Sequence, residues 1–145
     1  MGSLVGSLTD NNTTAALVNM LSFTEARQQV IAENVANLGL PGYATRQLDG
    51  KAFQTALRGA LDERAADPNK PLTLAETEEF GSRPDGTLRV TPVQWPQNAR
   101  FHDRTDASVE RQMSELAETS MMHQAASTLL KMRFDDLRKA IRGRF

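Results

Sequence analysis

A regular repeat near the C-terminus is the strongest constraint that this sequence places on its fold. Between Asp106 and Arg142, ten positions follow alternating steps of four and three residues, and seven of them are apolar. A repeat sustained over about five heptads is typical of the packing seam of one long helix. We therefore expect a C-terminal helix that packs through Val109, Met113, Leu116, Ser120, His123, Ser127, Leu130, Phe134, Leu137 and Ile141.

The same helix carries a second apolar stripe beside the first. The middle of the first stripe is small or polar, whereas the second contains two methionines and two alanines: Ala117, Met121, Ala125 and Met132. A helix with two apolar stripes can contact more than one neighbour.

The N-terminal part of the chain predicts a second long helix. From residue 15 to residue 37 no glycine or proline interrupts the pattern. Residues 1–14 are rich in Gly, Ser and Asn, so we expect them to be flexible and to supply the helix cap. The expected packing positions are Leu17, Leu21, Thr24, Gln28, Ile31, Val35 and Leu38, widened by Met20, Phe23 and Val30.

This helix should end abruptly within the stretch Glu33–Arg46. Gly39 can take the left-handed conformation that closes a helix. Pro41 lacks an N–H and disfavours helical geometry in the preceding residue. Gly42 fits the second corner of a turn that has proline at the first. The chain should therefore turn away from the helix at residues 39–42.

Residues 43–105 differ from both ends. Five of the six prolines lie here. We expect a short helix within 48–66, and a turn at Asp85–Gly86 followed by an edge-like strand through Val90.

The expected fold is mainly α. Its two terminal helices pair antiparallel as a coiled-coil-like hairpin, and a central irregular arm carries the short helix and minor β structure. The expected segments are 1–14, 15–42, 43–105 and 106–145.

Composition and motifs argue against catalysis. The 145 residues suit one domain, and a net charge of −1 creates no strong attraction to nucleic acid. The chain has no cysteine, and its two histidines fall in different predicted elements, so no metal site is expected. No nucleotide-binding or hydrolase motif occurs. We expect no enzyme activity, no cofactor and no small-molecule substrate.

Each histidine has a structural interpretation. His123 lies on the C-terminal seam, where a hydrogen-bonded packing histidine is expected. His102 lies in Phe101–Asp106, just before the helix start, where side chains can cap the helix. The candidate caps are Asp103, Thr105 and Asp106.

The C-terminal end is basic. Residues 131–145 contain six basic and two acidic side chains. These cations can complement the helix dipole, or they can form a patch that docks an acidic partner.

Two segments resemble a known family. The stretch Arg27–Tyr43 resembles the N-terminal signature of bacterial flagellar rod, hook and hook-associated proteins. The last segment, from Val109 onward, resembles the closing helix of the short proximal rod proteins of the FlgB type. Leu40 departs from the threonine usual in that family, and "FHDRTDAS" replaces its usual turn before the last helix. The motif residues are Asn34, Val35, Ala36, Asn37, then Leu40, Pro41, Gly42 and Tyr43.

The resemblance implies a structural subunit of the flagellar basal-body rod, which crosses the periplasm and transmits motor torque to the hook. Such subunits stack helically through their terminal helices. They are exported by the flagellar type III apparatus without a cleavable signal, and none is evident here. The implied partners are copies of the chain, other rod proteins, the membrane-ring adaptor and the export gate.

The resemblance also gives the turn a role, beside the simpler interpretation that it is an ordinary helix end. Asn34 and Asn37 would bond carbonyls at the helix end or the backbone of a neighbouring subunit, and Tyr43 would pack on the seam with its hydroxyl outward. The alternative for the whole chain is a soluble helical-hairpin adaptor or export chaperone that buries its seams within one molecule or a closed dimer.

Overall fold

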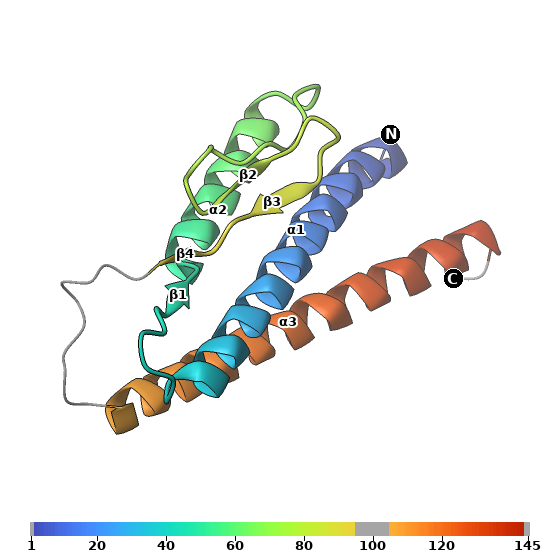
Figure 1. Ribbon diagram of the computed structural model, residues 1–145. Coiled ribbons are helices and arrows are strands. Elements are labelled where there is room, and N and C mark those ends of the chain that lie inside the picture. Colours follow the sequence, from blue (N-terminus) through green and yellow to red (C-terminus); the bar gives the residue numbers. More distant parts are fainter. Residues whose placement is uncertain (1, 95–104, 144–145) are drawn as a thin grey trace.

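The computed structural model describes residues 2–94 and 105–143, with side chains for 12–94 and 109–143. This part of the chain is mainly helical, with two long terminal helices and small antiparallel sheets (Figure 1). In chain order the elements are α1 (Gly2–Asn37), β1 (Arg46–Gln47), α2 (Gly50–Ala66), β2 (Phe80–Ser82), β3 (Leu88–Val90), β4 (Val93–Gln94) and α3 (Thr105–Ile141).

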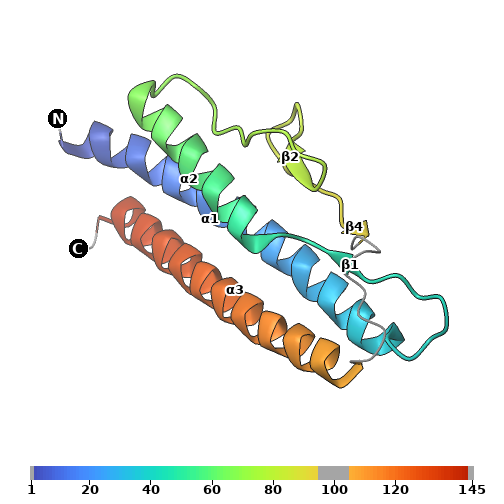
Figure 2. The same ribbon diagram turned by 90° about the vertical axis from the view of Figure 1, so that its left-hand side faces the viewer.

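The helix α1 lies at the centre of the molecule. Its partner α3 runs along one side in the opposite direction, while α2 and the β2–β3 hairpin cover another side (Figure 2). Hydrogen-bonded pairs show the antiparallel direction, since Asn34 bonds Gln112 and Thr24 bonds His123. Each long helix has 36 or 37 residues, which corresponds to a length of about 55 Å.

The expected start of the N-terminal helix near residue 15 needs correction. The backbone of α1 is helical from Gly2, so no helix start lies near residue 15. Adding residues to an existing helix costs far less than starting one, and a glycine costs only about 1 kcal/mol relative to alanine. Because residues 2–14 contain no proline, their weak helix formers do not stop the helix.

The arm is more regular than expected. The helix α2 has 17 residues, and the Asp49 carboxylate caps it by accepting hydrogen bonds from the N–H groups of Lys51 and Ala52 at 3.0 and 3.1 Å. Phe53, Leu57 and Ala60 recur at steps of four and three and are all buried. The helix expected within 48–66 is thus confirmed.

The turn at Asp85–Gly86 is also confirmed. Gly86 adopts a φ of 88°, and the Asp85 carboxylate accepts bonds from the Thr87 N–H at 3.0 Å and the Thr87 hydroxyl at 2.6 Å. The hydrogen bond from the Thr87 hydroxyl lowers the pKa of Asp85 below its ordinary value of 3.8, because it favours the charged carboxylate.

The expected strand through Val90 is β3, which pairs with β2 so that Phe80 lies opposite Val90. The strand β2 was not among the elements expected from the sequence, although the same Asp85–Gly86 turn that indicated β3 also connects the two strands. A second pair joins β1 to β4, with Arg46 opposite Gln94. This pair ties the start of the arm to its end.

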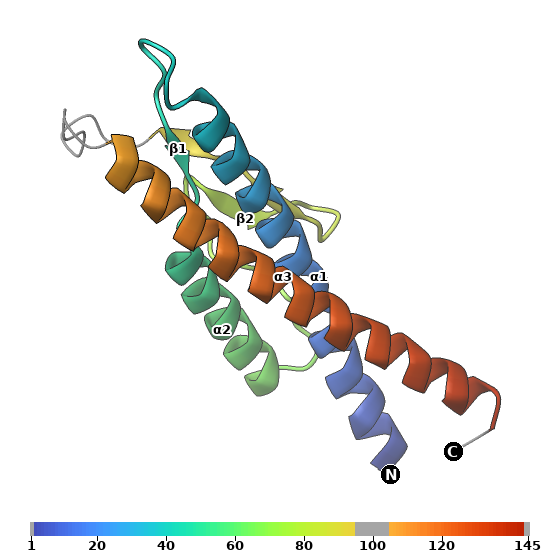
Figure 3. The ribbon, with the colours of Figure 1, turned by 90° about the horizontal axis from the view of Figure 1, so that it is seen from below.

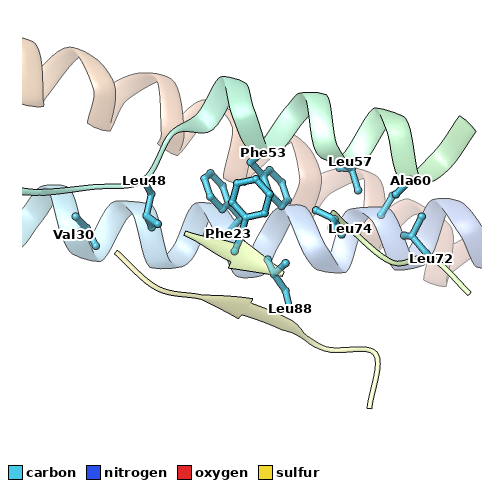
Figure 4. Close-up of a cluster of buried hydrophobic side chains, with 11 residues drawn as sticks. Phe23, Val30, Leu48, Phe53, Leu57, Ala60, Leu72, Leu74 and Leu88 are labelled. Carbon is cyan, nitrogen blue, oxygen red and sulfur yellow. The ribbon is translucent and has the colours of Figure 1, made fainter. Parts of the chain in front are cut away.

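An aromatic cluster joins the arm to α1. Phe23 of α1 stacks on Phe53 of α2, with parallel rings whose centroids lie 4.0 Å apart. Phe80 of β2 meets both rings edge-on, at 6.1 and 5.6 Å. Leucines from the arm surround these rings (Figure 4). The arm therefore shares its hydrophobic core with α1 and is part of the same folded unit.

Replacing Phe53 by alanine should lower the free energy of unfolding by about 3–5 kcal/mol, because the fully buried ring contacts both other phenylalanines. Urea denaturation followed by circular dichroism measures this change. The control is Phe134→Ala on α3, where the ring is 48% exposed and the loss should be less than about 1 kcal/mol. Equal losses in the two variants would contradict the position of the core.

Candidate assembly site

Asn34, the first residue of the family-like motif, is 1% exposed at the end of α1. Its Nδ2 donates to the Arg46 carbonyl at 2.7 Å, and its Oδ1 accepts from the Arg46 N–H at 3.1 Å. Nδ2 also donates to Oε1 of Gln112 on α3 at 3.2 Å, and the Tyr43 hydroxyl donates to Oδ1 at 3.1 Å. Both N–H groups and both oxygen lone pairs of the amide are therefore used.

Two expectations for this motif need correction. Asn34 bonds the backbone of the returning chain, not a carbonyl at its own helix end. Tyr43 points its hydroxyl inward to Asn34, not outward, because the buried Oδ1 needs a second donor. Asn37 does bond a carbonyl in the last turn, since its Nδ2 donates to the Glu33 carbonyl at 2.8 Å. The Glu33 carboxylate in turn forms an ion pair with Arg46.

The turn after α1 is only partly as expected. Gly42 has a φ of 78°, and the Tyr43 N–H donates to the Leu40 carbonyl at 3.2 Å, which confirms the turn with Pro41 and Gly42 at its corners. The left-handed conformation expected at Gly39 is wrong, because its φ is not positive. An earlier turn, closed by the Leu40 N–H and the Asn37 carbonyl at 3.0 Å, already ends the helix there.

Arg27 links α1, the arm and α3. Its Nε donates to the Leu48 carbonyl at 3.0 Å, and its Nη1 donates to the Thr119 hydroxyl oxygen at 3.0 Å. The Thr119 hydroxyl in turn donates a hydrogen bond to the backbone carbonyl of Glu115 at 2.7 Å. Thr119 is fully buried, so this network lies inside the α1–α3 interface. Arginine was not among the residues predicted to pack.

His123 is the hydrogen-bonded packing histidine that the sequence predicted. Its Nδ1 lies 2.8 Å from the Thr24 hydroxyl oxygen. The same hydroxyl oxygen lies 2.8 Å from the Met20 carbonyl and 3.1 Å from the Leu21 carbonyl, and the tautomer of His123 sets whether Nδ1 donates to it or accepts from it. One turn away, Gln28 donates to Ser120 at 3.1 Å. The middle of the helix pair is thus joined by polar side chains.

The face of α3 that is buried against α1 differs from the predicted seam. Its fully buried residues are Gln112, Thr119 and Ala126, which are seven residues apart. This spacing is itself a heptad repeat, but counting apolar residues does not reveal it. Predicted seam residues flank this face and are half-buried: Val109, Leu116, Ser120, His123 and Leu130.

The remaining predicted positions on α3 are exposed in the single chain. Ser127 is exposed, and Met113, Phe134, Leu137 and Ile141 are 50%, 48%, 45% and 84% exposed. Met113 lies on a different side of α3 from the buried face. The other three hydrophobic residues belong to the last turns of α3, and this end of α3 diverges from α1 (Figure 1).

The predicted packing positions on α1 face the interior. Leu17 and Ile31 are buried, and Leu21, Val35 and Leu38 are half-buried. The other motif residues lie on the surface: Ala36, Gly39, Leu40, Pro41 and Gly42 are exposed.

Two apolar surfaces of α3 remain open. The first, named here the inner groove, lies between α1 and the end of α3 and is lined by Leu21, Ser127, Leu130, Lys131, Phe134, Asp135 and Arg138. The second, named here the outer stripe, consists of exposed residues on the side away from α1: Met113, Ala117, Met121, Ala125, Leu129 and Met132. No described element covers this side (Figure 3).

The described residues contain no group of three or more His, Cys, Asp or Glu side chains that could hold a metal ion. His102 and the expected cap Asp103 lie outside the described residues, and the side chains of Thr105 and Asp106 do so too. Within the described part, no helix is long and apolar enough to cross a membrane.

Comparison with known proteins found no matching family model and no matching curated protein. The candidate site is therefore defined by its own geometry, which consists of packing surfaces and a hydrogen-bonded turn.

Replacing Asn34 by alanine should lower the free energy of unfolding by about 2–4 kcal/mol, because both backbone groups of Arg46 lose a buried partner. Urea denaturation measures the loss, and amide exchange at Arg46 should become faster. The control is Asn37→Ala, which removes one bond at a half-buried position and should cost less than about 1 kcal/mol. Unchanged exchange at Arg46 would show that Asn34 does not hold the returning chain.

Proposed function

We propose that this protein is a structural subunit of the bacterial flagellar basal-body rod, of the proximal type, that assembles helically and transmits motor torque. Its two terminal helices form a coiled-coil-like antiparallel hairpin in the inner layer of the rod. The proposal assigns it neither enzyme activity nor a cofactor, nucleic acid or small-molecule substrate.

The observation that carries this proposal is the exposure of large apolar side chains on both sides of α3. Seven such residues of this helix are at least 45% exposed in the single chain: Met113, Met121, Leu129, Met132, Phe134, Leu137 and Ile141. Contiguous apolar surface of this kind marks sites of protein association. A subunit that repeats head-to-tail needs two different surfaces, and the inner groove and outer stripe can supply them.

The motif at the end of α1 supports the same proposal. The bonds of Asn34 hold Arg46 beside the helix end, and the arm that follows packs on α1. Because the arm is directed to α1, the outer side of α3 stays open for neighbouring subunits (Figure 3). The turn thus has a role in assembly as well as in closing a helix.

In this proposal the subunit is exported by the flagellar type III apparatus and takes its place in the rod within the periplasm. Its partners are copies of itself, other rod proteins, the membrane-ring adaptor and the export gate. The basic end of α3 offers a docking surface for an acidic region of such a partner. Its described cations are Lys131, Arg133, Arg138, Lys139 and Arg142.

A soluble helical adaptor or export chaperone is the second candidate. The observation that favours it is the set of hydrogen bonds between α1 and α3, which allow the helix pair to form within one chain. The two candidates differ in whether the ends of these helices are stable before assembly.

Amide hydrogen exchange on dilute monomer separates the two candidates. For a rod subunit, we expect fast exchange in residues 12–17 and 130–142, because amphipathic helix ends gain most of their stability from neighbours. Residues 19–34 and 112–126 should exchange more slowly, since their side chains bond across the helix pair. Equally slow exchange along both helices would favour the adaptor.

The double substitution Pro41→Ala with Gly42→Ala should leave expression intact and impair motility when the gene replaces its natural copy. Alanine at residue 42 is strained because φ is 78° there, so the direction of the returning chain changes. Swimming in soft agar measures the effect.

Gly39→Ala is the matched control for this experiment, because its φ is not positive and an added Cβ meets nothing within 4 Å. We expect this variant to swim normally. Wild-type swimming of the double variant, or equal loss in the control, would contradict the role of the turn.

A further inference from the structure

The outer stripe of α3 has a shape that can accept a side chain like its own. A shallow hollow on this stripe is lined by Met121, Gln124, Ala125, Thr128 and Leu129. Four of these positions are i, i+3, i+4 and i+7, which is the set that forms a hole for one side chain of a facing helix. Met121 itself is 73% exposed and stands at one end of the hollow. The stripe therefore presents both a projecting methionine and a place for one.

The charges of α3 differ between its two halves. The described side chains before Met121 include three acidic residues and one basic residue: Glu110, Glu115, Glu118 and Arg111. Those after Leu130 include five basic residues and two acidic ones: Lys131, Arg133, Arg138, Lys139, Arg142, Asp135 and Asp136. Two such helices attract each other when antiparallel, whereas a parallel pair places like charges together.

From these two features we propose that the outer stripe binds the outer stripe of a second copy of this chain. The two α3 helices run antiparallel about a two-fold axis beside Ala125. In this arrangement, residues equally distant from Ala125 face each other across the contact. Met121, four residues before Ala125, then lies against Leu129 of the other copy, which is four residues after it. Ala117, eight residues before Ala125, lies within one residue of Met132 of the other copy, seven residues after it.

The same register brings opposite charges together at both ends of the contact. Glu110 lies eleven residues before Met121, and Lys139 lies eighteen after it, which is about three and five helical turns. Both residues are therefore on the side of the outer stripe, and both are exposed. Glu110, fifteen residues before Ala125, lies within one residue of Lys139 of the other copy, fourteen residues after it. Such exposed pairs contribute mainly to the orientation of the contact.

The small side chain at the axis permits close approach of the two helices. Ala125 leaves room in the centre, and each Met121 enters the hollow of the other copy, where its flexible side chain can adapt to the available space. A two-fold contact of this kind closes on itself. It would cover the outer stripe of unassembled chains and would have to open before they enter a polymer.

This inference rests on the proposed function only in that the same stripe would later contact rod neighbours. Its test uses the full purified chain in solution, whereas the proposed function is tested by motility. If no dimer forms in solution, the motility experiment still tests the proposed function. If the motility experiment contradicts the proposed function, the measurements of dimer formation still test this inference.

Disulfide cross-linking tests the register, because the natural chain has no cysteine. Ala125→Cys lies at the axis and should form a disulfide-linked dimer at least about tenfold faster than Met113→Cys, whose two copies would be about 36 Å apart. Met113 is a matched control, since it lies on the same stripe and would link readily in a parallel, in-register pair. Ala117→Cys mixed with Met132→Cys should link, although each alone should not.

Sedimentation equilibrium over about 1–300 μM protein tests the affinity. The natural chain should form a dimer, and Met121→Asp should raise its dissociation constant about tenfold or more. Folding of this variant should be unchanged because the side chain is exposed. Ile141→Asp, at an 84% exposed position outside the outer stripe, is the control and should leave the dimer unchanged.

Reversing the charges of Glu110 and Lys139 tests the electrostatic contribution to dimer formation. Glu110→Lys alone should weaken the dimer, and combining it with Lys139→Glu should restore it.

Three results would overturn the proposal. If the protein stays monomeric at every concentration, the outer stripe does not bind a second copy and is available to a different protein. Linking of Met113→Cys as fast as Ala125→Cys would show a parallel pair. Equal effects of Met121→Asp and Ile141→Asp would place the contact elsewhere on α3.

Discussion

The side-chain amide of Asn34 is the interaction on which the arrangement of this protein depends. It is buried where α1 ends, and its four hydrogen bonds reach Arg46, Tyr43 and Gln112. One residue thereby joins the helix, the returning chain and α3. A buried amide that lost these partners would be strongly unfavourable, so few alternative paths are open to the chain after the turn. The path it takes leads the arm onto α1 and leaves one side of α3 uncovered.

The contact between α1 and α3 is unusually polar for two long helices. Arg27, Thr24 and Gln28 of α1 each bond a side chain of α3. Directional bonds of this kind set the register of two helices more sharply than apolar contacts do, though they add less stability. Since polar side chains occupy the inner face, many of the large apolar side chains of α3 point outward. This inversion underlies both the proposed assembly and the proposed two-fold pair.

Much of the hydrophobic core lies elsewhere, between α1 and the arm. The three phenylalanines at residues 23, 53 and 80 come from α1, α2 and β2, and they are almost fully buried. The arm therefore stabilises the middle of α1, whereas the last hydrophobic residues of α3, Phe134, Leu137 and Ile141, are exposed. Amphipathic helix ends with exposed apolar residues gain stability when a neighbour covers them, and the proposed assembly would supply such a neighbour.

The sequence by itself determined the features that depend on local chemistry. The end of α1 at Asn37, the turn at Pro41–Gly42, the turn at Asp85–Gly86 and the extent of α3 follow from residues within a few positions of each other. The four-three repeat likewise showed that α3 carries apolar stripes. Only the tertiary structure decided which side of α3 is buried, where the Tyr43 hydroxyl points and what Arg27 binds. Those outcomes depend on partners far away in the chain, such as Thr119 for Arg27, and periodicity within one helix does not specify which neighbour covers each face.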